Sequence, residues 1–160
     1  MFGKPLSEYV RFAGLSLALI AGVALLRLVL SLAGVPSASV KWLSATVVLL
    51  LCALVYSALV HTKGFGSYKQ ILPVVWLQAV TMNVVIIAGI VLAISSGHDN
   101  IFTIPEFAGG QDGKNWFPHV FGHVIFGVVA GPLVLWGLGS LVMLVTKKVS
   151  KGPGAQRAAA

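Results

Sequence analysis

Four long stretches of apolar residues most constrain what this chain can fold into. They run from about Val10 to Leu32, Trp42 to Val60, Ile71 to Ile94 and Phe117 to Val145. A helix of about 20 apolar residues crosses the hydrocarbon core of a bilayer. Because lipid offers the backbone no hydrogen bonds, only helices and closed barrels span it. Each stretch is too long for a strand and apolar on all sides, so we predict an all-α integral membrane four-helix bundle.

The composition excludes several other classes of protein. Of 160 residues, 58% are hydrophobic and only 9% are charged, whereas soluble domains carry about 25% charged residues. An ordinary soluble domain, a disordered chain and a nucleic-acid-binding domain are therefore excluded. The lone cysteine, Cys52, rules out a disulfide framework and a cysteine-based zinc site. We expect residues 1–149 to form a single four-span transmembrane domain and residues 150–160 to form a flexible cytoplasmic tail.

The connections between the apolar stretches differ in length. Residues typical of tight turns, Gly34 and Pro36, then Gly64 and Gly66, separate the first three stretches. The third connection is a long loop of about 20 residues, from Ser95 to Trp116, with several apolar side chains. We expect it to lie on the membrane surface or to fold over the helix ends, because long loops are more often functional than short ones.

The basic residues are distributed unequally between the two sides of the predicted bundle. One side has Lys41 and Lys114, with Asp99, Glu106 and Asp112, while the other collects Lys4, Arg11, Lys63, Lys69, Lys147, Lys148, Lys151 and Arg157. Because cytoplasmic loops are enriched in Lys and Arg, we expect both termini in the cytoplasm, the long loop outside, and a bacterial cytoplasmic (inner) membrane. The first stretch is too long for a cleaved signal peptide and is interrupted by Arg27, so we interpret it as a span.

Small residues at a spacing of four indicate where helices pack closely in lipid. The first span has Gly14, Ala18 and Gly22, and the fourth has Gly127 and Gly131. We expect these to form contacts between helices, more readily within the chain than between chains.

The fourth span also contains residues that disturb a regular helix. Pro132 lacks the N–H of a helical hydrogen bond, so it is expected to bend the span. Gly137 and Gly139 are expected to loosen the following turns, because glycine is a weak helix former.

Histidines and acidic residues gather on the predicted outer side. His119 and His123 are four residues apart and therefore share one helix face, a spacing that suits a metal ion. His98, Asp99 and Glu106 belong to the same side and complete a candidate site for copper or zinc. The alternatives are a patch that protonates together and interfacial polar residues bonded to the loop and water.

Haem is a further candidate for the same histidines. One b-type haem would be held by His119 or His123 with His98 as its partner. The other half of the bundle offers only His61, so a two-haem arrangement is excluded.

Arg27 is the one basic residue deep in a predicted span. It is expected near the outer boundary, where a long side chain can reach the interface. The alternatives for its role are an anchor at the interface, an ion pair with Asp99, Glu106 or Asp112, and a contact to an anionic headgroup or a quinone.

Three polar residues, Gln78, Thr81 and Asn83, lie near the middle of the third span. Polar groups at that depth usually face protein. They indicate either hydrogen bonds between helices or a binding pocket or permeation path, with Asn83 on a different face from the other two.

These observations leave three functions open, with a non-catalytic subunit or accessory factor of a larger membrane complex first. Its partner would be another membrane protein or a second copy of the chain, within the lipid bilayer and without nucleic acid. The spans hold no acidic residue and the chain shows no catalytic motif, so an enzyme is not indicated. The alternatives are a metal- or haem-binding protein for electron transfer or metal handling, and a small channel or transporter.

Overall fold

The protein is a bundle of long helices, as seen in a computed structural model that describes residues 1–106 and 115–150. The first three spans are α1 (Leu6–Leu32), α3 (Ala45–Thr62) and α4 (Tyr68–Ser96), and a short α2 (Ser37–Val40) precedes α3. The last span consists of α5 (Trp116–Gly122), the π-helix η1 (His123–Ala130) and α6 (Gly131–Ser150). Four helices are long and apolar enough to cross a membrane, so the predicted all-α, four-span architecture is confirmed.

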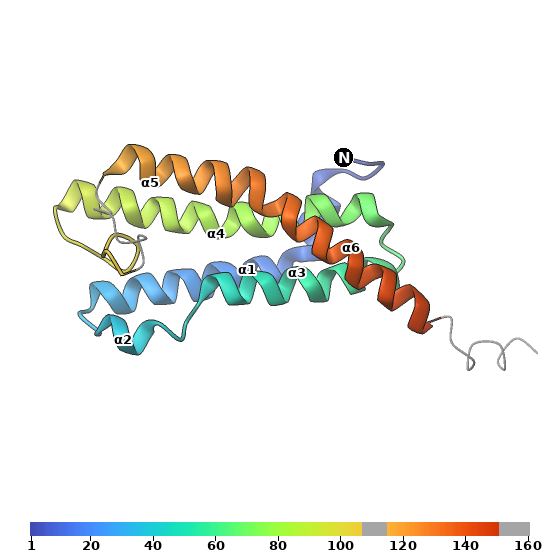
Figure 1. Cartoon of the computed structure of the whole chain (residues 1–160), viewed down its shortest axis with the longest axis horizontal. Helices are drawn as coiled ribbons and strands as arrows, with labels where there is room; N and C mark the ends of the chain where they lie inside the picture. Colours follow the sequence, from blue (N-terminus) through green and yellow to red (C-terminus); the bar gives the residue numbers. More distant parts are fainter. Residues whose placement is uncertain (107–114, 151–160) are drawn as a thin grey trace, which may run out of the picture.

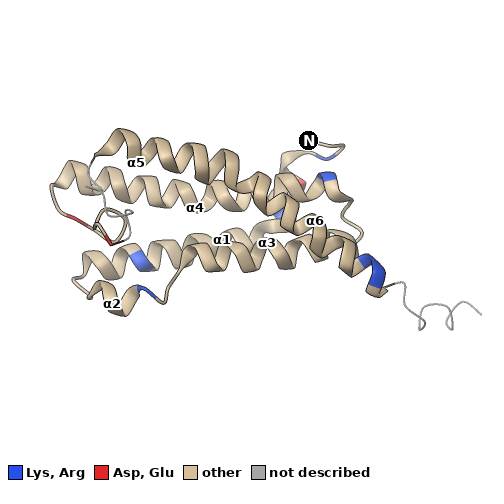
Figure 2. Cartoon of the chain, in the orientation of Figure 1, with Lys and Arg blue, Asp and Glu red and all other residues tan. Residues whose placement is uncertain are grey.

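The two ends of the bundle differ in what they carry. Figure 1 shows α1 beginning and α6 ending at one end, which we call the terminal end. The short α2 and residues 97–106 lie at the opposite end, which we call the loop end. Most Lys and Arg positions lie at the terminal end together with Glu8, whereas the acidic residues of 97–106, Arg27 and Lys41 lie in the loop half (Figure 2). This separation is the charge asymmetry on which the predicted orientation depends.

Glycines and a polar cap set where the helices stop and start. Gly34, Gly64 and Gly97 follow α1, α3 and α4 with φ of 80°, 63° and 74°, a left-handed conformation that glycine adopts without steric cost. The turns predicted at Gly34 and Gly64 are thereby confirmed. At the start of α4, the Ser67 N–H donates to Gln70 Oε1 at 2.8 Å, one half of a capping box.

Aromatic rings close the core at the terminal end. The Phe12 and Phe65 rings stack with centroids 4.0 Å apart, and Tyr9 and Tyr56 meet them edge-on at 5.3 and 5.6 Å. All four rings belong to α1, α3 or the turn before α4. Such pairs are worth about 0.5–1.5 kcal/mol beyond the area they bury, so they hold the first three spans together at this end.

Gly139 in α6 belongs to the same core. A β-carbon there would overlap the Ser57 hydroxyl of α3 and press on Ile71 of α4. Gly139 therefore allows α6 to pack closely on both helices, and the expectation that it loosens this half of the span is wrong. Gly137 is different, because a β-carbon there would meet no heavy atom within 4 Å.

The last span changes its helical pitch before Pro132. Residues His123–Ala130 form a π-helix of 8 residues. Pro132 cannot donate to the fourth carbonyl before it, and its ring would collide with that carbonyl, so the preceding turns widen. Figure 1 shows the span running beside α4 at the loop end and then crossing toward α3 at the terminal end. The predicted disturbance at Pro132 thus takes the form of π turns.

The segment after α4 folds back over the helix ends, as one of the two sequence-based expectations proposed. Ile101 and Phe102 are buried, and a β-carbon at Gly89 would collide with the Phe102 ring. The Asn100 side chain donates to the Gly89 carbonyl at 2.7 Å, which ties the segment to α4. Residues 97–106 therefore close the loop end of the bundle.

Candidate functional site

A cavity of about 280 Å³ lies in the half of the bundle nearest the loop end. Residues of α1, of the segment that leads into α3, of the first turn of α3, of α4, of the folded-back segment and of η1 form its wall. They are Arg27, Lys41, Ser44, Ala45, Thr46, Ile86, Ile101, Phe102 and His123. Apolar side chains and polar or basic ones both contribute to this wall. The pattern of a mostly preformed apolar pocket with a few placed polar groups is typical of ligand sites.

Two basic side chains border this cavity. Arg27 lies five residues before the end of α1 and is half-buried, as expected of a long side chain near the interface. Lys41 follows α2 directly, and its ammonium group lies 5.3 Å from the centroid of the Trp42 ring. Two basic residues and apolar residues of α4 and the folded-back segment therefore line the same cavity.

The first turn of α3 also faces the cavity. Ser44 caps the helix, since its hydroxyl oxygen accepts from the Val47 N–H at 3.3 Å. Helix geometry leaves the first backbone N–H groups without carbonyl partners of their own helix. Their dipoles make this end of α3 partly positive, and the Ser44 and Thr46 residues add hydroxyl groups to the same wall.

His123 is held by a polar residue of the neighbouring span. Its Nδ1 lies 3.0 Å from Asn83 Oδ1, and the Asn83 amide nitrogen donates to the Ala79 carbonyl at 2.8 Å. Because Asn83 Oδ1 can only accept, His123 Nδ1 must donate, which leaves Nε2 as the acceptor in the neutral ring. Gly127 makes room for this pair, as a β-carbon there would overlap the Asn83 amide.

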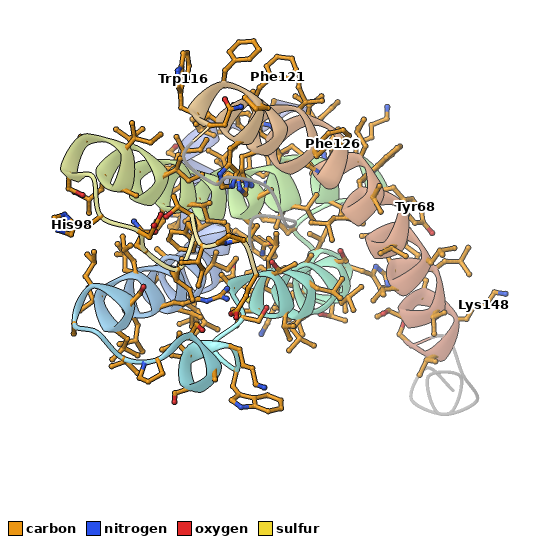
Figure 3. The ribbon with its side chains drawn as sticks, turned by 60° about the vertical axis from the view of Figure 1, so that its left-hand side comes forward. Tyr68, His98, Trp116, Phe121, Phe126 and Lys148 are labelled. Atoms are coloured by element: carbon orange, nitrogen blue, oxygen red, sulfur yellow. The ribbon has the colours of Figure 1, made fainter. Side chains whose placement is uncertain are left out.

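The predicted metal-binding residues are only partly brought together. The rings of His119 and His123 have centroids 5.2 Å apart, but His98 is exposed and points away from the bundle (Figure 3). The Nδ1 atom of His98 lies 2.9 Å from the Ser96 carbonyl oxygen. Within residues 1–106 and 115–150, no three His, Cys, Asp or Glu side chains are placed to hold a metal ion.

The acidic residues have partners on the surface of the loop end. Glu106 accepts from the Ser37 hydroxyl at 3.1 Å, and Asp99 accepts from the Thr103 hydroxyl at 3.1 Å. Neither borders the cavity that Arg27 lines. Asp112, the third predicted partner of Arg27, lies outside the described residues.

The three polar residues in the middle of α4 face different neighbours. Gln78 is fully buried and donates to the Ser16 hydroxyl of α1 at 2.9 Å, whereas Asn83 contacts η1. Thr81 donates to the carbonyl of Leu77 in its own helix at 2.8 Å. Asn83 was expected on a separate face, and its partner across the interface is His123.

Sequence reasoning missed four residues of this region: Lys41, Ser44 and Thr46 on the cavity wall and Asn100, which anchors the folded-back segment. Lys41 could have been noticed as one of the few basic residues on its side of the chain. Ser44, Thr46 and Asn100 belong to no sequence motif that would single them out. Only the fold places Ser44 and Thr46 at the same cavity as Arg27 and bonds Asn100 to Gly89.

No protein-family model matches this chain, and no curated protein or solved structure is significantly similar to it.

Proposed function

We propose that this four-span protein is a non-catalytic subunit of a larger membrane assembly and that it docks through one face of α1. The observation that carries the proposal is the position of Gly14, Ala18 and Gly22. A β-carbon at Gly14 or Gly22 would meet no heavy atom within 4 Å, and Ala18 and Gly22 are exposed on this chain. The expectation that this pattern packs within the chain is therefore not met.

An outward stripe of small residues suits a helix of another subunit. In lipid, helices associate where small residues let the two backbones approach closely. Two glycines of the last span, Gly127 and Gly139, pack within this chain against α4 and α3. The α1 stripe has the same composition with its space left open, which favours an occupant from outside the chain.

Substitution of Gly22 by leucine tests this proposal. Leucine at Gly22 adds bulk to the stripe, and its β-carbon would meet no heavy atom of the chain within 4 Å. Leucine at Gly137 is the matched control, since its β-carbon also meets nothing within 4 Å. We expect the wild type and Gly137→Leu to purify with a second protein from membranes at native expression, in mild detergent. Gly22→Leu should purify alone. A wild-type particle that contains only this chain, or a Gly22→Leu variant that retains its partner, would contradict the proposal.

A second candidate function, metal handling at His119 and His123, is favoured by one observation. Histidines that bind metals usually donate their other ring N–H to a fixed acceptor, and His123 donates from Nδ1 to Asn83. Its Nε2 is then the acceptor, with the His119 ring 5.2 Å away between centroids. Two imidazoles four residues apart suit copper or zinc better than a haem, because His98 does not face them.

Elemental analysis of protein purified without chelators tests this second function. We expect about one copper or zinc ion per chain in the wild type and in His98→Ala, and none in His123→Ala. His98 is the control because it is exposed and bonded to its own helix end. Metal-free wild-type protein that also fails to take up added copper or zinc would reject the metal function without affecting the docking proposal.

A further inference from the structure

We infer that a groove in the terminal half of the bundle binds an anionic phospholipid, with an acyl chain between α4 and the last span and the phosphate beside Lys69. The groove has a volume of about 300 Å³. Leu72, Pro73 and Trp76 of α4 form one of its walls. No residue of α1 lines it, so this inference is independent of the docking face proposed above.

The bend of the last span opens this groove. The span runs beside α4 in the loop half and crosses toward α3 beyond Pro132 (Figure 1). Val129, Pro132 and Leu133 line the groove where the two helices diverge. The first two residues of the chain form a third wall, and the Phe2 carbonyl is fixed beside α4 because it accepts from Gln70 Nε2 at 2.9 Å. Protein therefore bounds the groove on three sides.

The lining of the groove suits a hydrocarbon chain. Among the described residues that line it, Trp76 alone has a side chain that can form an ordinary hydrogen bond, through its indole N–H. A charged ligand thus finds no partner along the groove, whereas an acyl chain makes close contacts there. Because lipid tails are as apolar as such a lining, these contacts bring no hydrophobic driving force. Selectivity between lipids must therefore come from the headgroup.

Lys69 stands at the end of the groove nearest the membrane surface. It precedes Leu72, Pro73 and Trp76 by three, four and seven residues, so it shares their face of α4. An α4 of 29 residues is about 43 Å long and extends about 7 Å beyond each side of a hydrocarbon core of about 30 Å. Lys69 is the second residue of α4 and therefore lies at the depth of lipid phosphates, with the apolar lining directly below it.

The surroundings of Lys69 are positively charged. The ammonium group of Lys147 lies 4.2 Å from the ring centroid of Tyr68, the residue next to Lys69, so the end of α6 adds a second charge at the start of α4 (Figure 2). Within residues 1–106 and 115–150, Glu8 is the one acidic residue of this end, and its carboxylate lies 2.8 Å from Lys4 Nζ. Basic sites next to spans attract anionic headgroups. The groove and the two lysines together therefore favour a phospholipid with a net negative charge.

Native mass spectrometry of the detergent-solubilised full chain tests this inference. The chain is titrated with phosphatidylglycerol and with phosphatidylcholine that has the same acyl chains. One lysine near a lipid surface contributes about fivefold to affinity, so we expect phosphatidylglycerol to bind at least about fivefold more tightly. Equal affinities for the two lipids would overturn the inference. A dimer that excludes lipid would also overturn it, because a second copy of the chain would then fill the groove.

Charge variants decide whether the headgroup lies beside Lys69. Lys69→Gln should remove most of the preference for phosphatidylglycerol. Lys63→Gln is the matched control, because Lys63 lies at the same end directly after α3, a helix that does not line the groove. Both lysines are exposed, so both variants retain the fold. Equal losses in the two variants would mean that the whole basic end attracts lipid without a defined site.

A groove-filling variant decides where the acyl chain lies. Val129→Phe places a ring in the groove, and we expect it to weaken binding of both lipids at least about fivefold. Val55→Phe is its control, because Val55 of α3 lines no described part of the groove and the two valines are 55% and 54% exposed. Unchanged binding in Val129→Phe, or an equal loss in Val55→Phe, would contradict the inference.

Discussion

The two halves of this bundle are built from similar apolar helices but are closed in different ways. At the terminal end, stacked rings of Phe12 and Phe65 and the close approach of Gly139 to Ser57 fill the space between spans. At the loop end, buried apolar side chains such as Ile86, Ile90 and Phe102 also form a core, but a cavity and polar groups lie beside it, and α5 and η1 contain no buried residue. The comparison indicates that both halves have an apolar core, whereas the cavity and the candidate polar site lie in the loop half.

The π-helix before Pro132 marks the transition between these halves. On its terminal side, α6 packs on α3 and α4 through Gly139 and Met143. On its loop side, the span is tied to α4 through the pair of His123 and Asn83. π-helical turns are frequent at functional sites, and here they lie where tight packing gives way to a polar contact.

The largest expected effect is on the terminal half. Leucine at Gly139 would collide with Ser57 and Ile71, so we expect the free energy of unfolding to fall by about 2–3 kcal/mol. Denaturation in detergent micelles measures the loss. Leucine at Gly137, whose β-carbon meets no heavy atom within 4 Å, should change stability by less than about 0.5 kcal/mol. Equal losses in the two variants would show that Gly139 has no special packing role.

A smaller and more local effect is expected at the loop half. Asn83→Leu removes the acceptor for His123 Nδ1, and leaving a buried donor unbonded costs about 1–3 kcal/mol. Hydrogen exchange should become faster in residues 119–130 and stay unchanged in α1 and α3. The control is Thr81→Val, because Thr81 bonds only to its own helix. Unchanged exchange in residues 119–130 would mean that the pair does not hold the last span.

The smallest effect concerns the contact between α1 and α4. Gln78 donates to the Ser16 hydroxyl, and no described residue donates to Gln78 Oε1, which is also buried. Ser16→Ala should cost about 1 kcal/mol, whereas Ser16→Ala with Gln78→Leu should be nearly neutral, because both polar partners are then gone. Stabilities of the two single variants and the double variant give the coupling, expected to be at least about 1 kcal/mol because the double variant regains what Ser16→Ala loses. Strict additivity would show that the hydrogen bond contributes nothing.

Much of the architecture could be predicted from the sequence because apolar length is a direct physical requirement of a bilayer. The four spans and the turns at Gly34 and Gly64 followed from it, with most helix ends a few residues further out and the start of α3 three residues later than predicted. The proximity of His119 and His123 followed from helical periodicity. In contrast, the partner of Asn83 depends on how α4 is rotated against η1, which a single sequence does not encode locally.

Small residues show the limit of sequence reasoning most clearly. Gly22, Gly137 and Gly139 are alike in a sequence pattern, yet only Gly139 packs against a neighbouring span. The rotation of each helix decides which glycine faces protein, and that rotation is set by all contacts of the helix together. The cavity was missed for the same reason, since Lys41, Ser44 and Arg27 meet only once α1 and α3 are packed.

Cysteine accessibility along α4 tests the difference between the two halves most directly. In a Cys52→Ala background, a single cysteine replaces Ile86, which borders the cavity, or Ile90 or Ile71, which are fully buried and do not. A small water-soluble thiol reagent should modify the cysteine at Ile86, although it is ten residues from the end of α4, and should spare those at Ile90 and Ile71. The account would be contradicted if Ile86→Cys were protected from the reagent. It would also be contradicted if reactivity depended only on distance from the helix ends, so that Ile90→Cys and Ile71→Cys reacted first.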